Sequence, residues 1–525
     1  MSAVANFELL LLLLAIIVLL DLIAQKLGMP RAAALVVGGL CFAAIPGTPD
    51  VAVDPELVFV LFLPPLLMSS AWFTSWRDFK SDLRMILQLA VGAVFFTTLT
   101  VGFIAHLVLP SLPWAACFAL GAIVAPPDAV AAKAVLAKLP LPPRILMLLE
   151  GESLVNDASG LVLLRMAIAA TFSGAFHYGD LVLGFGWAAL GGVTIGSLFA
   201  FAAVTILRRI DDLDLGITAT FLIAWISYIA GEKLGVSGVL STVTCGMIVG
   251  SRQHEIIGAA LRIRGTAVWG AAVFVLESSV FVLIGLSLKS IAERLGGYDA
   301  IVGLMAPTAA VVAVVVLSRF VWVYLGSYLP RFLFKSIRLV DPYPPPAIPF
   351  VMSWAGMRGV VSLAAALALP DAFPGRDTIL VITFAVILVT VIVQGMTLPF
   401  LIELMLGKGI LNVRREMNEA EARASVIGAQ LLAVKRRSSG SRGGERFPEL
   451  VEEYSARKEA ADRAAFEPAG TANEPSERLK AALAAIEAGR SQLLRLHHAG
   501  KINGNVLHEL EESLDVEEVS IRKLS

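Results

Sequence analysis

The sequence predicts an all-α membrane protein that crosses the bilayer many times and ends in a polar, helical tail. Of its 525 residues, 57% are hydrophobic and only 16% are charged, and the mean hydropathy is +0.78. A soluble protein carries about a quarter charged residues, so most of this chain belongs in a lipid environment. Long apolar segments follow one another along the chain, and the composition changes abruptly after Leu411.

The apolar segments set the number of membrane spans. A helix needs about 20 apolar residues to cross the hydrocarbon core. We therefore expect about thirteen spans, near residues 6–24, 32–47, 55–74, 85–109, 113–137, 146–174, 180–207, 213–231, 236–251, 267–288, 299–328, 346–369 and 378–405. The run from Phe7 to Ala24 lacks a basic leader and a small-residue cleavage site, so we expect a retained span and not a signal peptide.

Basic residues mark alternate loops between these spans. The intervening loops hold only Lys233, Lys289, Arg294 and Arg376. Loops rich in lysine and arginine stay on the cytoplasmic side. We therefore expect an outside N-terminus and a cytoplasmic C-terminus in a plasma membrane or bacterial inner membrane. The basic loops hold Lys26 and Arg31; Arg77, Lys80 and Arg84; Lys138 and Arg144; Arg208 and Arg209; Arg252, Arg262 and Arg264; and Arg331, Lys335 and Arg338.

The fifth and twelfth spans are both interrupted. Pro126 and Pro127 remove two backbone donors and obstruct the preceding turn, so the fifth helix should break there. In the twelfth span, Gly356 and Gly359 flank Arg358. Glycines can simply permit close helix packing, but paired interruptions seven spans apart indicate inverted repeats with a site between them. Spans one to six and eight to thirteen would form these repeats.

The sixth span carries the main candidate for a binding residue. Asp157 and Asn156 lie near its middle, Ser153 lies one helical turn before Asp157, and Asp128 follows the proline break. A charge in the hydrocarbon region costs at least about 2.5 kcal/mol and is a functional candidate by default. Burial favours the neutral form of a carboxyl, so Asp157 can hold either a proton or a monovalent metal cation. Asp128 could be a second ligand or a partner for the freed helix ends.

Other charges in the spans need partners. A buried glutamate requires a counter-charge, so we expect a structural ion pair between Glu152 and Arg358. Glu277 and Arg319 are expected to pair internally or to line a vestibule. Glu150 and Lys133 could lie in a cytoplasmic funnel, and Arg165 could be architectural.

The chain divides into two predicted domains. Residues 1–409 would form the transmembrane exchanger domain and residues 410–525 a cytoplasmic, mostly helical tail. The tail has charged, helix-like runs separated by SSGSRGGE and EPAGTANEP, which are typical of flexible linkers. Apolar residues recur at helical spacing in its third run, so that run should pack on something. We expect the tail to be regulatory or to stabilise a dimer.

Motifs of other protein classes are missing. The sequence has no GxxxxGK[ST] phosphate-binding loop, no zinc-type spacing and no nucleophile elbow with a full triad. Its three cysteines are far apart in apolar segments. We expect neither an enzyme nor a cofactor, and no nucleic-acid binding.

Four short segments carry a resemblance to a known family. They are PDAV (Pro127 to Val130), GESLVND (Gly151 to Asp157), GMRGVVSLA (Gly356 to Ala364) and, more weakly, LPPLL (Leu63 to Leu67). At these residues the chain resembles the NhaP/NHE-type sodium/proton exchangers over about residues 6–405. The resemblance implies a homodimer with a dimerisation domain and a moving six-helix core. It also implies two crossed, broken helices in that core and elevator-like alternating access.

The resemblance also implies roles for residues. Asp157 would bind the ion, with Asn156, Ser153 and Asp128 near the site, and Glu152 would pair with Arg358. One position departs from the family pattern: Pro127 stands where a threonine is common. This change leaves the ion preference open.

The sequence thus favours a secondary antiporter that exchanges Na⁺ (or Li⁺) for H⁺ and so serves pH homeostasis and sodium transport. A K⁺/H⁺ antiporter on the same scaffold is the nearest alternative. An ion channel, or a membrane sensor with an output tail, is an alternative from another class. A channel would not need a titratable carrier such as Asp157.

Overall fold

The computed structural model describes residues 3–43, 45, 55–128, 132, 136, 142–174, 178–294, 298–406, 419–438, 447–466, 474–498, 510, 514 and 516–518. Every regular element in these described residues is a helix. The chain divides into two compact units, Met1–Asn412 and Val413–Ser525. The predicted boundary at residues 409 and 410 lies close to this division, outside the described residues.

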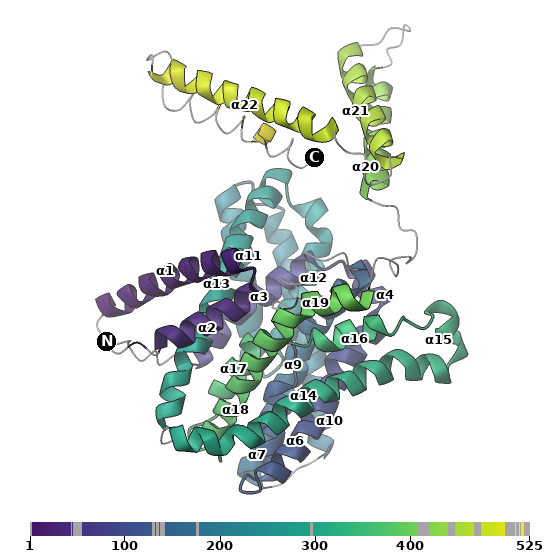
Figure 1. The fold of residues 1–525 in the computed structure, drawn as a ribbon. Coiled ribbons are helices and arrows are strands. Elements are labelled where there is room, and N and C mark those ends of the chain that lie inside the picture. Colours follow the sequence, from purple (N-terminus) through teal and green to yellow (C-terminus); the bar gives the residue numbers. More distant parts are fainter. Residues whose placement is uncertain are drawn as a thin grey trace. The chain divides into compact units, whose positions relative to one another are not determined.

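The first half of the membrane unit contains the helices α1 to α10 (Figure 1). They are α1 (Ala3–Leu27), α2 (Arg31–Ala43), α3 (Pro55–Phe73), α4 (Trp76–Ser81), α5 (Leu83–Leu87), the π-helix η1 (Gln88–Ala93), α6 (Val94–Val108), α7 (Trp114–Val124), α9 (Pro143–Ser173) and α10 (Tyr178–Leu207).

The second half of the unit contains the helices α11 to α19. They are α11 (Leu213–Lys233), α12 (Gly238–Ile256), α13 (Ala259–Arg294), α14 (Tyr298–Leu333), α15 (Lys335–Val340), α16 (Ala347–Trp354), α17 (Val360–Leu367), α18 (Arg376–Val389), the π-helix η2 (Thr390–Gln394) and α19 (Gly395–Leu406).

The lengths and composition of these helices confirm a polytopic helical membrane protein. Each predicted span coincides at least in part with a helix, although the end of the second span and most of the fifth span after Asp128 lie outside the described residues. Among the described residues, three shorter apolar helices accompany seven that are long and apolar enough to cross a membrane. The seven are Leu83–Val108, Arg144–Ser173, Leu183–Leu207, Leu213–Lys233, Ala260–Leu286, Val302–Leu333 and Arg376–Met405.

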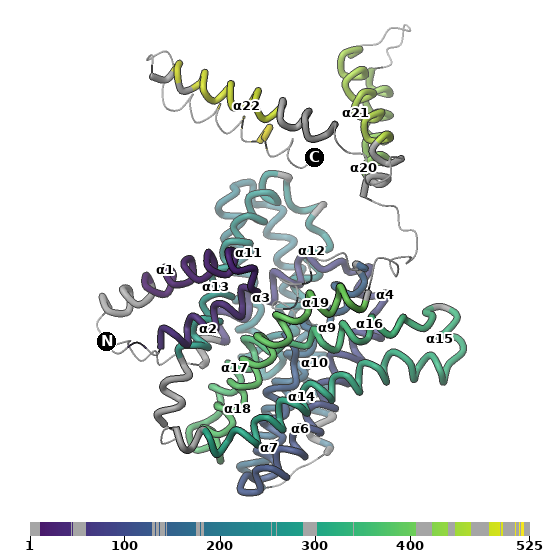
Figure 2. The backbone as a smooth tube through the Cα atoms, in the orientation of Figure 1, coloured from purple at the N-terminus to yellow at the C-terminus, as the bar shows by residue number. Residues whose placement is uncertain are grey.

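Small residues allow some of these helices to approach closely. α2 lies against α13 (Figure 2), and a Cβ atom on Gly39 would lie 2.6 Å from the carbonyl oxygen of Val282. A Cβ on Gly285 would lie 2.5 Å from the carbonyl oxygen of Val36. Contact of backbone against backbone is typical of helix packing in membranes, where no hydrophobic force drives helices together. Large apolar side chains such as Leu183 and Trp187 on α10 instead remain exposed, as expected for a lipid-facing surface.

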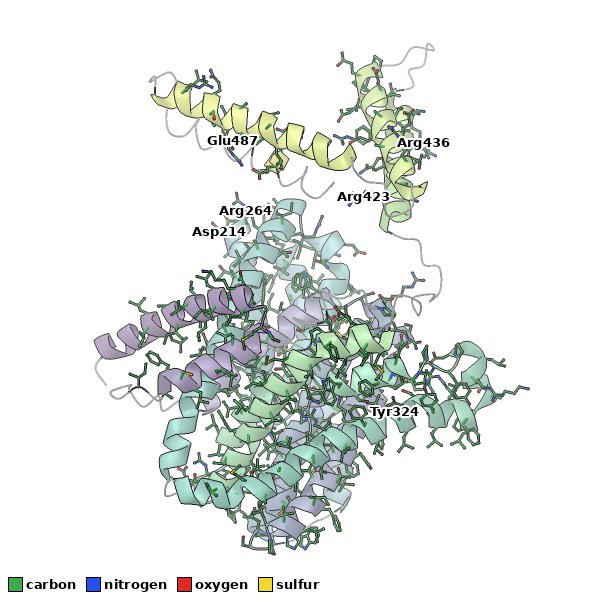
Figure 3. All side chains as sticks on the ribbon, in the orientation of Figure 1. Asp214, Arg264, Tyr324, Arg423, Arg436 and Glu487 are labelled. Carbon is green, nitrogen blue, oxygen red and sulfur yellow. The ribbon has the colours of Figure 1, made fainter. Side chains whose placement is uncertain are left out.

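α14 packs on α16 through aromatic side chains and hydrogen bonds. The Tyr324 hydroxyl (Figure 3) donates to the carbonyl oxygen of Pro346 at 3.0 Å. The ring of Phe320 meets the rings of Phe350 and Trp354 edge-on. α14 is thereby held beside the short helix that precedes the twelfth-span break.

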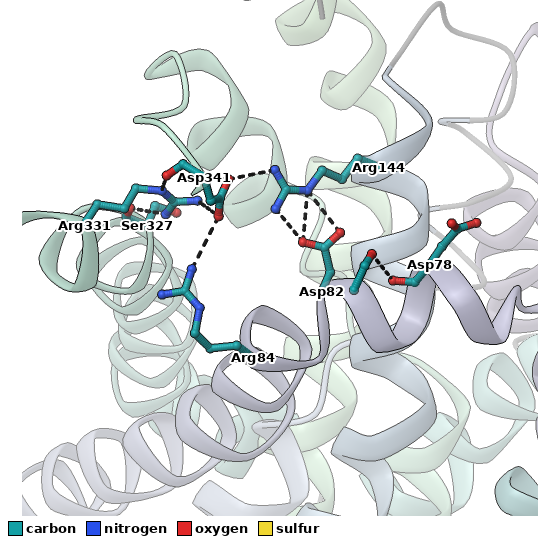
Figure 4. Close-up of polar contacts among 8 residues, drawn as sticks. Asp78, Asp82, Arg84, Arg144, Ser327, Arg331 and Asp341 are labelled. Atoms are coloured by element: carbon teal, nitrogen blue, oxygen red, sulfur yellow. Dashed lines mark hydrogen bonds and ion pairs between the residues drawn. The ribbon is translucent and has the colours of Figure 1, made fainter. Parts of the chain in front are cut away.

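A network of arginines and aspartates joins segments from both halves of the membrane unit (Figure 4). Arg144, at the start of α9, donates to Asp82 at 3.1 Å and to Asp341 at 3.0 Å. Asp341 also accepts from Arg331 at 2.6 Å and from Arg84 at 3.4 Å. Burial alone would raise the pKa of the Asp341 carboxyl, but these guanidinium groups outweigh it and hold that pKa below its usual range.

The second unit contains α20 (Glu419–Ser438), α21 (Pro448–Phe466) and α22 (Glu474–His498). α20 and α21 pack on each other, and the Ser438 hydroxyl accepts a hydrogen bond from the Phe447 amide at 3.1 Å. α22 buries Ile486 and pairs Arg490 with Glu518 at 2.7 Å. The third run of the tail therefore packs at least partly on the segment that follows it. Both predicted linkers lie largely outside the described residues.

Candidate cation site

The fifth span breaks at the two prolines. α7 ends at Val124, and residues 125–128 are not helical. Pro126 and Pro127 have no amide hydrogen to continue the helical ladder. The next amide, that of Asp128, donates to the carbonyl oxygen of Met357 at 2.7 Å. The backbone of one interrupted span therefore bonds directly to the backbone of the other.

The twelfth span breaks at the two glycines. α16 ends at Trp354 and α17 begins at Val360, with Gly359 as its N-terminal cap. A Cβ atom on Gly359 would lie 1.7 Å from Oδ2 of Asp128, so a side chain at this position would force Asp128 to move. Asp128 thus lies beside the N-terminus of α17, where the helix dipole favours a negative charge.

Arg358 is buried between the two breaks and donates to backbone oxygens. Its Nε donates to the carbonyl oxygen of Val124 at 2.8 Å and its Nη2 to that of Ala125 at 3.3 Å. A third bond runs from Nη1 to the carbonyl oxygen of Gly356. The last carbonyls of a helix lack partners within it, and a positive charge is favourable at that end. Arg358 therefore caps the interrupted end of α7.

The sequence predicted an ion pair between Glu152 and Arg358. This prediction is wrong. Both Glu152 oxygens instead accept from Arg319 of α14, at 2.6 and 3.0 Å. Arg319 also donates to the carbonyl oxygen of Met352, and a Cβ on Gly356 would lie 2.2 Å from its Cδ. Arg358 donates to the carbonyl oxygens of Val124, Ala125 and Gly356, and Gly356 leaves room for Arg319 to reach the glutamate. The prediction that Arg319 pairs internally is consistent with this contact.

A cavity of about 70 Å³ lies between the breaks and α9. One water molecule needs only about 10–15 Å³ of such space, so several waters or a partly hydrated ion would fit. Asp157 is only 6% exposed and lines this cavity. None of the described residues around the cavity is lysine or arginine. Its acidic lining residues are Asp128, Glu150, Asp157 and Glu277.

The other predicted site residues lie in or beside this cavity. Ser153, Pro126, Pro127 and Gly359 line it. Asn156 is fully buried and donates from Nδ2 to the carbonyl oxygen of Pro127 at 2.7 Å. Asn156 therefore ties α9 to the proline break and fixes the helix turn that carries Asp157. The predicted funnel residue Lys133 lies outside the described residues.

Sequence reasoning did not identify two serines at the cavity. Ser70 on α3 and Ser362 on α17 both line it. Hydroxyl groups are ordinary in membrane helices, so neither serine carried a signal comparable to a buried charge. The only available hint for Ser362 was its position four residues after Arg358, in an otherwise apolar half-span.

Comparison with known proteins identifies the family. A family profile described as sodium/hydrogen exchanger, transmembrane, matches residues 10–404. The chain belongs to the sodium/hydrogen exchanger family. This confirms the resemblance inferred from the four sequence segments. The matched region includes both helix breaks, Asp157 and the ion pair of Glu152 with Arg319.

Two relatives show how far this exchanger resembles other members. A protein named sodium, potassium, lithium and rubidium/H⁺ antiporter, from Bacillus pumilus (strain SAFR-032), is 35% identical over 413 residues. That match covers 74% of the exchanger and 61% of the relative, so the exchanger spans about three fifths of its length. A protein named uncharacterized Na⁺/H⁺ exchanger YjcE, from Escherichia coli (strain K12), is 30% identical over 489 residues, covering 88% and 89% of the two chains.

A solved structure supports the fold. The exchanger matches the structure titled sodium proton antiporter MjNhaP1 from Methanocaldococcus jannaschii with a TM-score of 0.62. The match covers 78% of the exchanger and all of the other chain at 22% identity. At this identity the likeness establishes a shared fold alone.

Proposed function

We propose that this chain is a secondary antiporter that exchanges Na⁺ (or Li⁺) for H⁺ across the membrane. The observation that carries the proposal is Asp157, buried in a cavity whose described lining contains acidic residues but no basic one. A carboxylate at this depth must be neutralised, and either a proton or a monovalent cation can do so. Because the two compete for one group, release of one accompanies binding of the other.

The cavity residues then have distinct roles in the proposal. Asp157 binds the cation or the proton, and Ser153 lies one turn away on the same helix. Asp128 adds negative charge beside the start of α17, and Asn156 holds α9 against the proline break. The buried pair of Glu152 and Arg319 and the cap formed by Arg358 keep the two breaks together.

Family membership supports the remaining parts of the proposal. The exchanger would work as a homodimer in a plasma or bacterial inner membrane, with its N-terminus outside and its C-terminus in the cytoplasm. Its core would carry Asp157 between the two sides by elevator-like alternating access. The helical tail would regulate transport or stabilise the dimer.

The identity of the transported cation is the least constrained part of this proposal. The Bacillus pumilus relative is named for sodium, potassium, lithium and rubidium, whereas the Escherichia coli relative is named for sodium alone. Monovalent cations differ mainly in size and dehydration cost, and a few oxygen ligands decide between them. A K⁺/H⁺ antiporter therefore stays the nearest alternative.

Proteoliposomes that contain the full chain test this function. An acid-inside pH gradient is imposed, and Na⁺, Li⁺, K⁺ or Rb⁺ is added outside as the chloride, with choline chloride as the control. We expect Na⁺ or Li⁺ to dissipate the gradient with saturable concentration dependence, and choline to leave it intact. Cation flux without proton movement would indicate a channel. The absence of any cation response would contradict antiport and favour a sensor.

A further inference from the structure

Among the described residues that line the cavity, one fully buried hydroxyl group has no hydrogen-bond partner. Ser362 is 1% exposed, and its Oγ is among the buried side-chain atoms that lack a partner within the described part of the chain. A buried hydroxyl left in this condition is unfavourable, because it has given up hydrogen bonds to water without gaining others. The other such atoms belong to Asn156, Ser278, Thr383 and Gln394, none of which lines the cavity. Ser362 alone combines an unpaired buried oxygen with a position on the cavity wall among the described residues.

Ser362 lines the same cavity as Asp157 but belongs to a different helix. It lies in the first turn of α17, three residues after Gly359, whereas Asp157 lies on α9. α17 contacts α3, α7 and α9. The cavity is therefore bounded by side chains from both interrupted spans and from the sixth span.

We propose that Ser362 Oγ is a direct ligand of the transported cation, which it binds together with Asp157. This proposal rests on the antiport function proposed above. A serine hydroxyl has two lone pairs and suits a small, hard cation. A bound cation supplies a partner for this hydroxyl, which finds none among the described residues.

The Ser362 hydroxyl is neutral, and its effect on cation binding differs from its effect on proton binding. A proton is held by the Asp157 carboxyl itself and needs no further oxygen ligands, whereas a cation needs several. The Ser362 hydroxyl therefore favours the cation over the proton. Pro127 offers no hydroxyl, and one lone pair of its carbonyl oxygen already accepts a hydrogen bond from Asn156.

The test compares three variants of the full chain in detergent and in proteoliposomes. Ser362→Ala removes the hydroxyl, and Ser362→Thr retains it. The matched control is Ser353→Ala: Ser353 is equally buried, lies on α16 of the same interrupted span, and donates to the carbonyl oxygen of Pro349 at 2.7 Å. Two quantities are measured for each: the cation concentration giving half-maximal exchange, and the rise in melting temperature that the same cation produces.

We expect Ser362→Ala to raise the half-saturating cation concentration about tenfold, the equivalent of one lost ligand contact. Its maximal rate should change little, and more cation should be needed for the same thermal stabilisation. Ser362→Thr and Ser353→Ala should stay within about twofold of wild type. If Ser362→Ala melts at a different temperature from wild type without cation, its cation-induced shift still reports binding.

The outcomes separate the two proposals. If wild-type exchanger responds to cation and Ser362→Ala responds identically, Ser362 is not a ligand but antiport stands. If Ser362→Ala and Ser353→Ala weaken binding equally, the effect is structural and the ligand role is overturned. If wild type shows neither cation-dependent exchange nor cation-induced stabilisation, the antiport function fails and the Ser362 proposal fails with it.

Discussion

Glu152→Gln is expected to destabilise the exchanger by about 3–5 kcal/mol. Glu152 and Arg319 are both almost fully buried and form two hydrogen bonds, at 2.6 and 3.0 Å. Removing the carboxylate charge leaves the Arg319 guanidinium in a low-dielectric interior without its counter-ion. Thermal or denaturant unfolding of the purified protein measures the loss. Glu403→Gln, which changes an exposed carboxylate near the end of α19, should have no measurable effect.

Double variants identify the partner of Glu152. Adding Arg319→Gln to Glu152→Gln removes the stranded charge, so part of the lost stability should return. Adding Arg358→Gln should instead deepen the loss, because the carbonyl oxygens of Val124 and Ala125 lose their donors. Recovery with Arg358→Gln and not with Arg319→Gln would show that the observed pairing is wrong.

Gly359→Ala is expected to reduce the exchange rate at least tenfold. The new Cβ would lie 1.7 Å from Oδ2, 2.6 Å from Cγ and 2.8 Å from Cβ of Asp128. The whole Asp128 side chain must then move, although its amide is bonded to Met357 at the other break. Overpacking of this kind also costs about 1–3 kcal/mol of stability. Cation-dependent dissipation of a pH gradient in proteoliposomes measures the rate.

Two control variants test whether the clash with Asp128 causes the loss of exchange in Gly359→Ala. Gly270→Ala on α13 places a Cβ with nothing within 4 Å and should exchange at the wild-type rate. Combining Gly359→Ala with Asp128→Ala removes part of the clash, so stability should partly recover even if transport does not. Normal exchange by Gly359→Ala alone would mean that the close contact of the two breaks is dispensable.

Features that depend on one residue type could be read from the sequence. Pro126 and Pro127 cannot continue a helical ladder, and Asp157 is an ionisable group within an apolar span. In the structure, one helix break lies at these prolines and the other lies between Trp354 and Val360. Asp157 is buried beside them. The helical character and the order of the apolar spans followed from hydrophobic length, because only a helix satisfies the backbone of a single segment in lipid.

Features that depend on three-dimensional proximity could not be read in this way. Arg319 and Arg358 are both buried cations, and nothing in the sequence ranks them as partners of Glu152. The choice is made by the carbonyl oxygens at the end of α7 and by the space above Gly356. Ser362 was equally hidden, since it differs from the other described serines only in combining an unpaired buried hydroxyl with a position on the cavity wall.

In the proposed transport cycle, Asp157 carries the cation and the proton in turn. The most direct measurement compares wild type with Asp157→Asn for dissipation of an imposed pH gradient by the best cation. Asparagine keeps the size of the side chain but can neither release a proton nor neutralise a cation. We predict that cation-dependent dissipation disappears in Asp157→Asn while the protein still folds, as judged by its melting temperature. Dissipation that survives the substitution would contradict the account.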